Sequence, residues 1–244
     1  MTNTIENIEN RLQEAIVFYW QTREQQKSKQ TRGGRPDQGA RSAVTGGAQM
    51  SKFIQLLTDL MLGAGAKLEE IFHNKALELP GFFRPTKEWD LLMVREQQLV
   101  VAIEAKSQVG PSFGNNFNNR TEEAMGSALD LWTAFREGAF NSTVRPWLGY
   151  LFLLEDCPRS MRPVKTREPH FPVFPEFKNA SYAKRYELFC RKLIRERHYS
   201  SAAFLMSSRT GGLRGEYAEP ARDLTFHVFA RSLAAQISIY RGGK

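Results

Sequence analysis

The chain has 244 residues, in which 34 lysines and arginines outnumber 26 aspartates and glutamates, for a formal net charge of +8. This length can bury a sizeable core without disulfide or metal staples, and the positive charge favours a polyanionic partner such as nucleic acid or an anionic membrane surface. Cys157 and Cys190 form no CxxC pair, so the sequence indicates neither a disulfide framework nor a structural zinc site.

The N-terminal residues and the hydropathy favour a cytoplasmic protein. Residues 1–6 lack the basic-then-apolar order of a signal peptide, and no apolar run is long enough to span a bilayer. We therefore expect a soluble protein in a reducing compartment, with no membrane partner.

We expect residues 1–244 to form a single domain that begins with a helix over about 3–20. Apolar residues recur there at three- and four-residue spacing: Ile5, Ile8, Leu12, Ala15, Ile16 and Tyr19. Residues 21–48 are polar and basic and contain several glycines, which predicts a loop or arm. Arg35 and Arg41 in this arm are candidate DNA contacts, although a solvated loop fits the pattern equally well. A second helix is predicted over 50–61, ended by Gly63.

The middle of the chain predicts a sheet. A short strand is expected at 76–79, and apolar runs at 89–95 and 99–106 are separated only by Glu96-Gln97-Gln98, which suggests an antiparallel hairpin. A helix over 119–137 then leads to a continuous apolar strand at 147–154, with Asn119 placed to begin the helix and Gly138 to end it. Strand, helix, strand in that order predicts a parallel crossover, and hence an α/β core.

The rest of the chain continues this pattern. Five prolines between residues 156 and 180 predict a long irregular excursion. A helix is expected over 182–197, a strand over 202–206 and a last helix over 224–240. The predicted architecture is a central mixed sheet flanked by helices.

The hairpin carries the candidate chemistry. If it turns at Gln97, Asp90 lies opposite Glu104, and Lys106 follows two residues later on the same face. Cross-strand Cβ atoms are about 4.5–5.5 Å apart, which allows two carboxylates to share a divalent cation. Hydrolysis of a phosphodiester requires neutralisation of phosphate charge and a hydroxide near neutral pH, and Mg²⁺ bound by Asp90 and Glu104 can supply both. Lys106 could then orient or deprotonate the attacking water, with its pKa depressed by the metal.

Glu-x-Lys at the end of a strand is also common on solvated faces. Burial argues for the catalytic interpretation, because the hairpin register places Leu92, Val94, Val100 and Ala102 on the face of the charges, and buried acids usually have partners. A single β-bulge in the hairpin would move Asp90 to the other face.

Two stretches resemble a known family. Asp90 followed by Glu104-Ala105-Lys106 resembles the motif of the PD-(D/E)xK nucleases, although Trp89 stands where that family has a proline. Residues 82–90 and 106–123 resemble the XhoI family of type II restriction endonucleases, and the resemblance runs from about Asp37 to the end of the chain.

This resemblance implies a PD-(D/E)xK restriction-endonuclease-like core and a catalytic centre of Asp90, Glu104 and Lys106. It also implies a Mg²⁺-dependent homodimer that cuts double-stranded DNA at the palindrome CTCGAG, after the first cytosine of each strand. A companion DNA methyltransferase would protect the host DNA.

The segment after the second hairpin strand is a candidate DNA-reading loop. Glycine-bounded residues 114–120 contain four asparagines and an arginine, which pair with base edges or hold phosphates. The candidate contacts are Asn115, Asn116, Asn118, Asn119 and Arg120, and Asn119 could instead merely cap the helix.

Other residues admit simpler interpretations. Gly110-Pro-Ser-Phe-Gly114 matches a serine nucleophile elbow in form, but Ser112 lies six residues after Lys106, too far from the strand for that turn. Glu69 and Glu70 could supply an auxiliary carboxylate, but ordinary solvated glutamates explain them as well. Basic residues of the excursion, among them Arg159 and Arg162, could grip DNA or form a solvated charge run.

Four hypotheses follow from the sequence. The first is a sequence-specific restriction endonuclease, and the second is a repair or structure-specific nuclease with the same three catalytic residues. The others are a non-catalytic DNA-binding module and a serine hydrolase built on Ser112. Four observations would distinguish them. Discrete plasmid fragments would indicate restriction, and cleavage only at flaps or mismatches would indicate repair. Binding without turnover would indicate a DNA-binding module, and ester hydrolysis would indicate the serine hydrolase.

Overall fold

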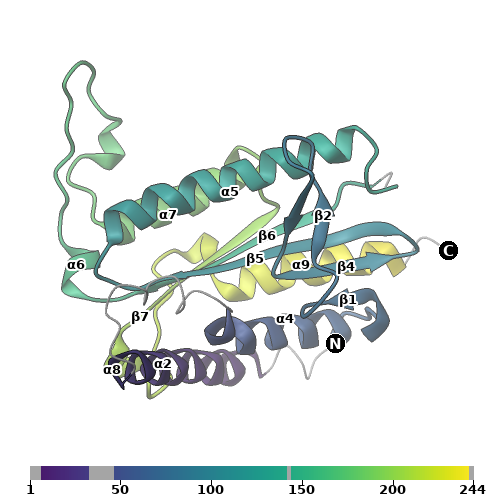
Figure 1. The fold of residues 1–244 in the computed structure, drawn as a ribbon, viewed down its shortest axis with the longest axis horizontal. Helices are drawn as coiled ribbons and strands as arrows, with labels where there is room; N and C mark the ends of the chain where they lie inside the picture. The colour runs from purple at the N-terminus through teal and green to yellow at the C-terminus, as the bar shows by residue number, and fades with distance from the viewer. Residues whose placement is uncertain (1–6, 33–46, 142–143, 242–244) are drawn as a thin grey trace.

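The computed structural model describes residues 7–32, 47–141 and 144–241 (Figure 1). Its helices are α2 (Ile8–Arg32), α4 (Ser51–Gly63), α5 (Phe113–Arg136), α6 (Pro158–Met161), α7 (Tyr182–Arg195), α8 (Arg209–Gly212) and α9 (Phe226–Arg241). Its strands are β1 (Ile71–Phe72), β2 (Glu78–Pro80), β3 (Thr86–Glu88), β4 (Leu91–Arg95), β5 (Gln98–Gln108), β6 (Trp147–Glu155) and β7 (Ser201–Ser207). Short 3-10 turns occupy Ala48–Met50, Leu68–Glu70, Pro175–Phe177 and Arg222–Leu224.

One five-stranded mixed sheet organises the described part of the chain. The strand order is β1-β4-β5-β6-β7. β1, β4 and β5 pair antiparallel, whereas β5, β6 and β7 run parallel. The predicted crossover from β5 through α5 to β6 is confirmed. β2 and β3 form a separate antiparallel pair, and β1 and β3 are strands that the sequence analysis did not anticipate.

Helices cover both faces of the sheet. Apolar residues of α2, α4 and α9 pack on one face in a single buried cluster, and those of α5 and α7 pack on the other face in a second cluster. Figure 1 shows the same two layers, with α5 and α7 on one side of the sheet and α4 on the other. Because β5 and β6 are covered on both faces, β6 is almost continuously apolar and β5 is apolar over residues 99–103. The expected α/β class, a mixed sheet flanked by helices, is confirmed.

The hairpin between β4 and β5 turns more tightly than predicted. Arg95 pairs with Gln98, so only Glu96 and Gln97 form the turn. Both have positive φ, 50° and 63°, as a type I′ hairpin turn requires. The prediction of a three-residue turn over 96–98 was therefore wrong.

A β-bulge offsets this shorter turn. Val94 pairs with Leu99, but Met93 pairs with Val101, so Val100 is an extra residue in β5. The bulge returns the strands to the expected register, because the extra residue in the strand replaces the one missing from the turn.

The register beyond the bulge decides where the charged residues lie. Leu91 pairs with Ile103, which makes Asp90 and Glu104 the next facing pair, as predicted. Val100 was expected on the same face as Glu104, and this was wrong. Val100 packs in the opposite cluster with α2, α4 and α9, because the bulge reverses side-chain alternation before Val101.

The first helix is longer than expected. Residues 21–32 were predicted to be loop, but α2 continues through them to Arg32. Their glutamines, glutamates, lysines and arginines are good helix formers, and the first glycine pair comes only at 33–34. The rest of the predicted arm at 33–46, with the candidate contacts Arg35 and Arg41, lies outside the described residues.

α5 begins six residues before its predicted start. It starts at Phe113, so residues 114–118 are helical rather than a loop, and Asn119 is inside the helix rather than its cap. Tertiary packing explains the early start, because Phe113 stacks on Tyr182 and Phe117 packs edge-on against Tyr186 of α7. Gly114 permits this approach, since a Cβ there would lie 2.8 Å from the Tyr182 hydroxyl.

The remaining predicted elements are confirmed with small shifts at their ends. The helix expected over 182–197 is α7, the strand expected over 202–206 is β7, and the last helix is α9. Gly138, with φ 82°, follows the end of α5 as predicted. Within 156–180, α6 and one 3-10 turn interrupt an otherwise irregular course. No helix in the described ranges is long and apolar enough to cross a membrane.

Candidate active site

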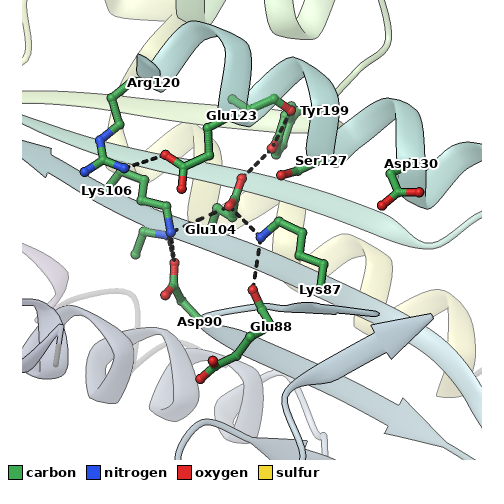
Figure 2. A network of polar contacts seen from close by, with 12 residues as sticks. Lys87, Glu88, Asp90, Glu104, Lys106, Arg120, Glu123, Ser127, Asp130 and Tyr199 are labelled. Carbon is green, nitrogen blue, oxygen red and sulfur yellow. Dashed lines mark hydrogen bonds and ion pairs between the residues drawn. The ribbon is translucent and has the colours of Figure 1, made fainter. Parts of the chain in front are cut away.

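Asp90, Glu104 and Lys106 converge on one face of the hairpin (Figure 2). Lys106 Nζ lies 3.0 Å from Asp90 Oδ2 and 3.6 Å from Glu104 Oε1. Asp90 is held at the start of the hairpin, because its backbone N–H donates to Ile103 O at 3.1 Å and its Oδ2 accepts from Ala105 N–H at 2.8 Å. The predicted convergence of the three side chains is therefore present in the structure.

Glu104 is completely buried and is surrounded by donors. Its Oε1 accepts from Lys87 Nζ at 2.7 Å, and its Oε2 accepts from the Tyr199 hydroxyl at 2.8 Å. Burial alone would raise the pKa of Glu104, but Lys106 and Lys87 outweigh it and hold that pKa below its usual value. Glu104 is therefore a carboxylate at neutral pH.

Lys106 is the cation between the two acids. Burial would lower the pKa of Lys106, but Glu104 and Asp90 raise it above the usual lysine value. Without a metal, Lys106 is thus an ammonium ion and cannot accept a proton. The depressed pKa expected for Lys106 refers to the metal-bound state, so the raised value leaves that prediction open.

The small β2–β3 sheet brings Lys87 into the site. Its side chain is 11% exposed, lies 4.2 Å from the centre of the Trp89 ring and donates to Glu88 O at 3.0 Å. The sequence analysis named no role for Lys87. The one signal that could have found it was its position in the stretch 82–90 that carries the family resemblance.

Asp130 of α5 fastens the loop between β2 and β3. It is 3% exposed and accepts from the backbone N–H groups of Phe82 at 2.6 Å and Phe83 at 2.8 Å, and from Arg84 Nε at 2.7 Å. Gly81 is required beside it, because a Cβ there would lie 2.4 Å from Asp130 Oδ2. The position of Lys87 therefore depends on α5.

The second turn of α5 borders the site. Arg120 forms an ion pair with Glu123, and both side chains lie next to Lys106 (Figure 2). Asn116 and Arg120, four residues apart on one helix face, are half-buried. Asn115, Asn118 and Asn119 are exposed. The five candidate DNA contacts of this segment thus lie on one helix, and Arg120 is the one of them that Figure 2 shows beside the site.

The excursion after β6 meets the start of α5. Arg159 and Arg162 line a depression of about 330 Å³ together with Ser112 and Asn115. Ser112 is exposed there and lies four residues after the end of β5. It is therefore not at the sharp strand-to-helix turn of a nucleophile elbow.

The carboxylates of Asp90 and Glu104 suit a divalent cation. The Lys106 ammonium contacts both of them, so Asp90 and Glu104 are the residues that would hold such a cation. Hard cations such as Mg²⁺ prefer carboxylate oxygens and commonly use only one or two of them. Among the residues described, no group of three or more His, Cys, Asp or Glu side chains could hold a metal, so a site here rests on this pair.

Glu69 and Glu70 lie elsewhere. Glu70 Oε1 lies 3.5 Å from Arg95 Nε, and Glu70 accepts from the backbone N–H of Lys67. Glu69 is exposed and 3.9 Å from Lys67 Nζ. Glu69 is thus a solvated glutamate, as expected, whereas the prediction was wrong for Glu70, whose side chain is 12% exposed and paired with Arg95.

This mixed sheet, with an acid before one strand and Glu-Ala-Lys on the next, defines a restriction-endonuclease-like protein. The family model described as "Restriction endonuclease XhoI" matches residues 29–219. The chain belongs to the XhoI family of restriction endonucleases.

Three curated relatives agree with this assignment. The type II restriction enzyme BstVI of Geobacillus stearothermophilus is 57% identical over 207 residues, covering 83% of this chain and 92% of the relative. The type II restriction enzyme XhoI of Xanthomonas vasicola is 51% identical over 158 residues, 64% of each chain. The type II restriction enzyme AbrI of Azospirillum brasilense is 48% identical over 172 residues, 70% of this chain and 77% of the relative. No solved structure matches the chain.

Proposed function

We propose that this XhoI-family protein is a Mg²⁺-dependent type II restriction endonuclease that acts as a single domain. It hydrolyses double-stranded DNA at CTCGAG, after the first cytosine of each strand. The observation that carries the proposal is the convergence of Asp90, Glu104 and Lys106, with Lys106 Nζ within 3.6 Å of both acids. The site chosen for cutting rests on the family resemblance alone.

Each catalytic residue has a role that follows from its contacts. Asp90 and Glu104 would hold Mg²⁺, which supplies charge neutralisation at the phosphate and lowers the pKa of bound water. Burial and the Tyr199 hydrogen bond keep Glu104 in one orientation. Lys106 donates hydrogen bonds toward the attacking water and the phosphate, because its ammonium already lies between the two acids.

DNA contacts are proposed on α5 and on the arm that contains residues 33–46. Asn115, Asn116, Asn118, Asn119 and Arg120 extend along α5 from the acidic pair toward the depression that Arg159 and Arg162 line. Asparagine and arginine side chains suit base edges, and arginines also hold phosphates. Arg35 and Arg41 are proposed as phosphate contacts on the basis of sequence alone.

A palindromic site is most simply read by two copies of the chain, because a twofold axis places the same residues on both strands. We therefore propose a homodimer on DNA, and a companion methyltransferase that protects the host's own sites. Sedimentation of the complex with a CTCGAG duplex should show two chains, and an active complex with one chain would contradict the dimer.

Plasmid cleavage tests the function directly. Protein with Mg²⁺ should linearise a plasmid that carries one CTCGAG site and leave intact a matched plasmid with one base of the site changed. EDTA should abolish cutting, and Ca²⁺ should permit binding without efficient hydrolysis, because its looser coordination activates water poorly. Cleavage restricted to flaps or mismatches would indicate a repair nuclease instead.

A further inference from the structure

The acidic pair is electrically balanced by two lysines from different parts of the fold. Lys106 reaches it from β5, and Lys87 reaches it from β3, which belongs to the separate two-stranded sheet. Both ammonium groups approach the same oxygen, Glu104 Oε1, at 3.6 Å and 2.7 Å. Two carboxylates and two ammonium groups carry no net charge.

A balanced site resists an added cation. A divalent cation that binds between Asp90 and Glu104 would meet two positive charges within a few ångströms, in a site where Glu104 is fully buried. Like charges at such distances repel strongly when they are shielded from water. A DNA phosphate beside the site would offset the excess charge, so cation and phosphate should bind there cooperatively.

We infer that Lys87 is a second active-site lysine, which neutralises Glu104 in the metal-free protein and contacts the DNA phosphate when a divalent cation occupies the acidic pair. This inference rests on the proposed nuclease function. Of the two lysines, Lys87 is the one that we expect to leave Glu104 for the phosphate. It pairs with only one acid of the site, Glu104, whereas Lys106 also contacts Asp90.

Lys87 keeps other contacts when it leaves Glu104. Its ammonium donates to Glu88 O at 3.0 Å and lies 4.2 Å from the Trp89 ring centre, and Trp89 is 2% exposed. The hairpin that carries Lys87 is itself fastened to α5 by Asp130. These contacts would hold the strand in place when the Lys87 ammonium turns away from Glu104.

Calcium titration without DNA tests the counterion role, because it requires no cleavage. Lys87→Met removes the charge and keeps an unbranched side chain, and it should bind Ca²⁺ at least about tenfold more tightly than the unaltered protein. Lys52→Met is the matched control, since Lys52 is an exposed lysine of α4 on the other side of the sheet. It should leave Ca²⁺ affinity unchanged. Lys87→Arg keeps the charge and should also leave it unchanged.

Single-turnover cleavage at saturating Mg²⁺ tests the phosphate contact. Lys87→Met should cut at least about tenfold more slowly than the unaltered protein despite its tighter metal binding, and Lys87→Arg should recover part of the rate. Lys87→Gln is a second neutral variant, to be used if Lys87→Met does not fold, and should behave like it in both assays.

The two assays separate the possible failures. Unchanged or weaker Ca²⁺ binding in a folded neutral variant would overturn the counterion role. Tighter Ca²⁺ binding with a normal cleavage rate would overturn the phosphate contact. If the unaltered protein cut no DNA, the proposed function would fail, whereas the Ca²⁺ titration would still report on Lys87 and Glu104.

Discussion

The Tyr199 hydroxyl donates a hydrogen bond to Glu104 Oε2 at 2.8 Å, across 95 positions of sequence. Both side chains are buried, and the same hydroxyl lies 3.2 Å from Ala124 O of α5. Tyr199 thereby orients the Glu104 carboxylate so that its other oxygen, Oε1, faces Lys87 and Lys106.

Tyr199→Phe should lower the free energy of unfolding by about 1–3 kcal/mol, because it leaves a buried carboxylate oxygen without its donor. Urea denaturation measures this loss. Tyr217→Phe is the control, because Tyr217 is half-buried and packs against the apolar cluster of α2, α4 and α9 on the other face of the sheet. It should lower the free energy of unfolding less than Tyr199→Phe does. Equal losses in the two variants would show that the hydrogen bond to Glu104 adds nothing specific.

The lowered pKa of Glu104 predicts a pH dependence of stability in EDTA. A group whose pKa is lower in the folded protein contributes stability that is present above its unfolded pKa and is lost as pH falls through the folded value. Unaltered protein should therefore be more stable than Glu104→Gln above pH 4.5, the ordinary glutamate value. This difference should shrink as the pH falls below 4.5. A pH-independent difference in urea denaturation between about pH 3 and about pH 7, values chosen to lie either side of that pKa, would contradict the assigned charge.

Asp130 should control the hairpin that carries Lys87. Asp130→Ala removes the acceptor of two backbone N–H groups and of Arg84, and should cost about 2–3 kcal/mol of stability. Hydrogen exchange at the Phe82 and Phe83 amides should accelerate. Asp130→Asn keeps an acceptor and should have a smaller effect on both measurements. Unchanged exchange in Asp130→Ala would mean that other interactions hold the loop.

The candidate DNA-binding residues on α5 predict a change in specificity. Arg120→Ala or Asn116→Ala should reduce discrimination between CTCGAG and one-base variants, by about 1–3 kcal/mol for each bidentate pairing with a base that the substitution removes. Competition binding in Ca²⁺ measures this. Arg136→Ala, at the far end of the same helix, is the control and should change neither affinity nor specificity. If Arg120→Ala weakens binding to all sequences equally, Arg120 holds phosphate only.

Much of the fold was predictable because its signals are local. The buried parallel strand β6 is a continuous apolar run, and Asp90, Glu104 and Lys106 follow from strand alternation once the hairpin is recognised. The predicted register was correct although the turn was wrong, because the bulge at Val100 offset the shorter turn. Sequence alone does not reveal a compensation of this kind, since β4 and the first half of β5 are apolar on both faces.

The late predicted start of α5 and the two missed site residues share a physical cause, which is packing between distant parts of the chain. α5 starts at Phe113 rather than Asn119 because Phe113 and Phe117 pack on α7, which is distant in the sequence, and tertiary packing of this kind overrides local propensity. Lys87 and Tyr199 were missed because they reach Glu104 through a separate sheet and from the segment just before β7. Such long-range partners leave no periodic signal near Asp90, Glu104 and Lys106.

Cleavage by three single-residue variants tests the central claim most directly. Asp90→Ala, Glu104→Ala and Lys106→Ala should each cut a CTCGAG plasmid with Mg²⁺ on the order of a thousandfold or more slowly than the unaltered protein, because several kcal/mol of transition-state stabilisation are removed. Lys106→Ala should still bind Ca²⁺ and DNA, whereas Asp90→Ala and Glu104→Ala should no longer bind Ca²⁺. Full cleavage by any of the three folded variants would contradict the placement of the active site.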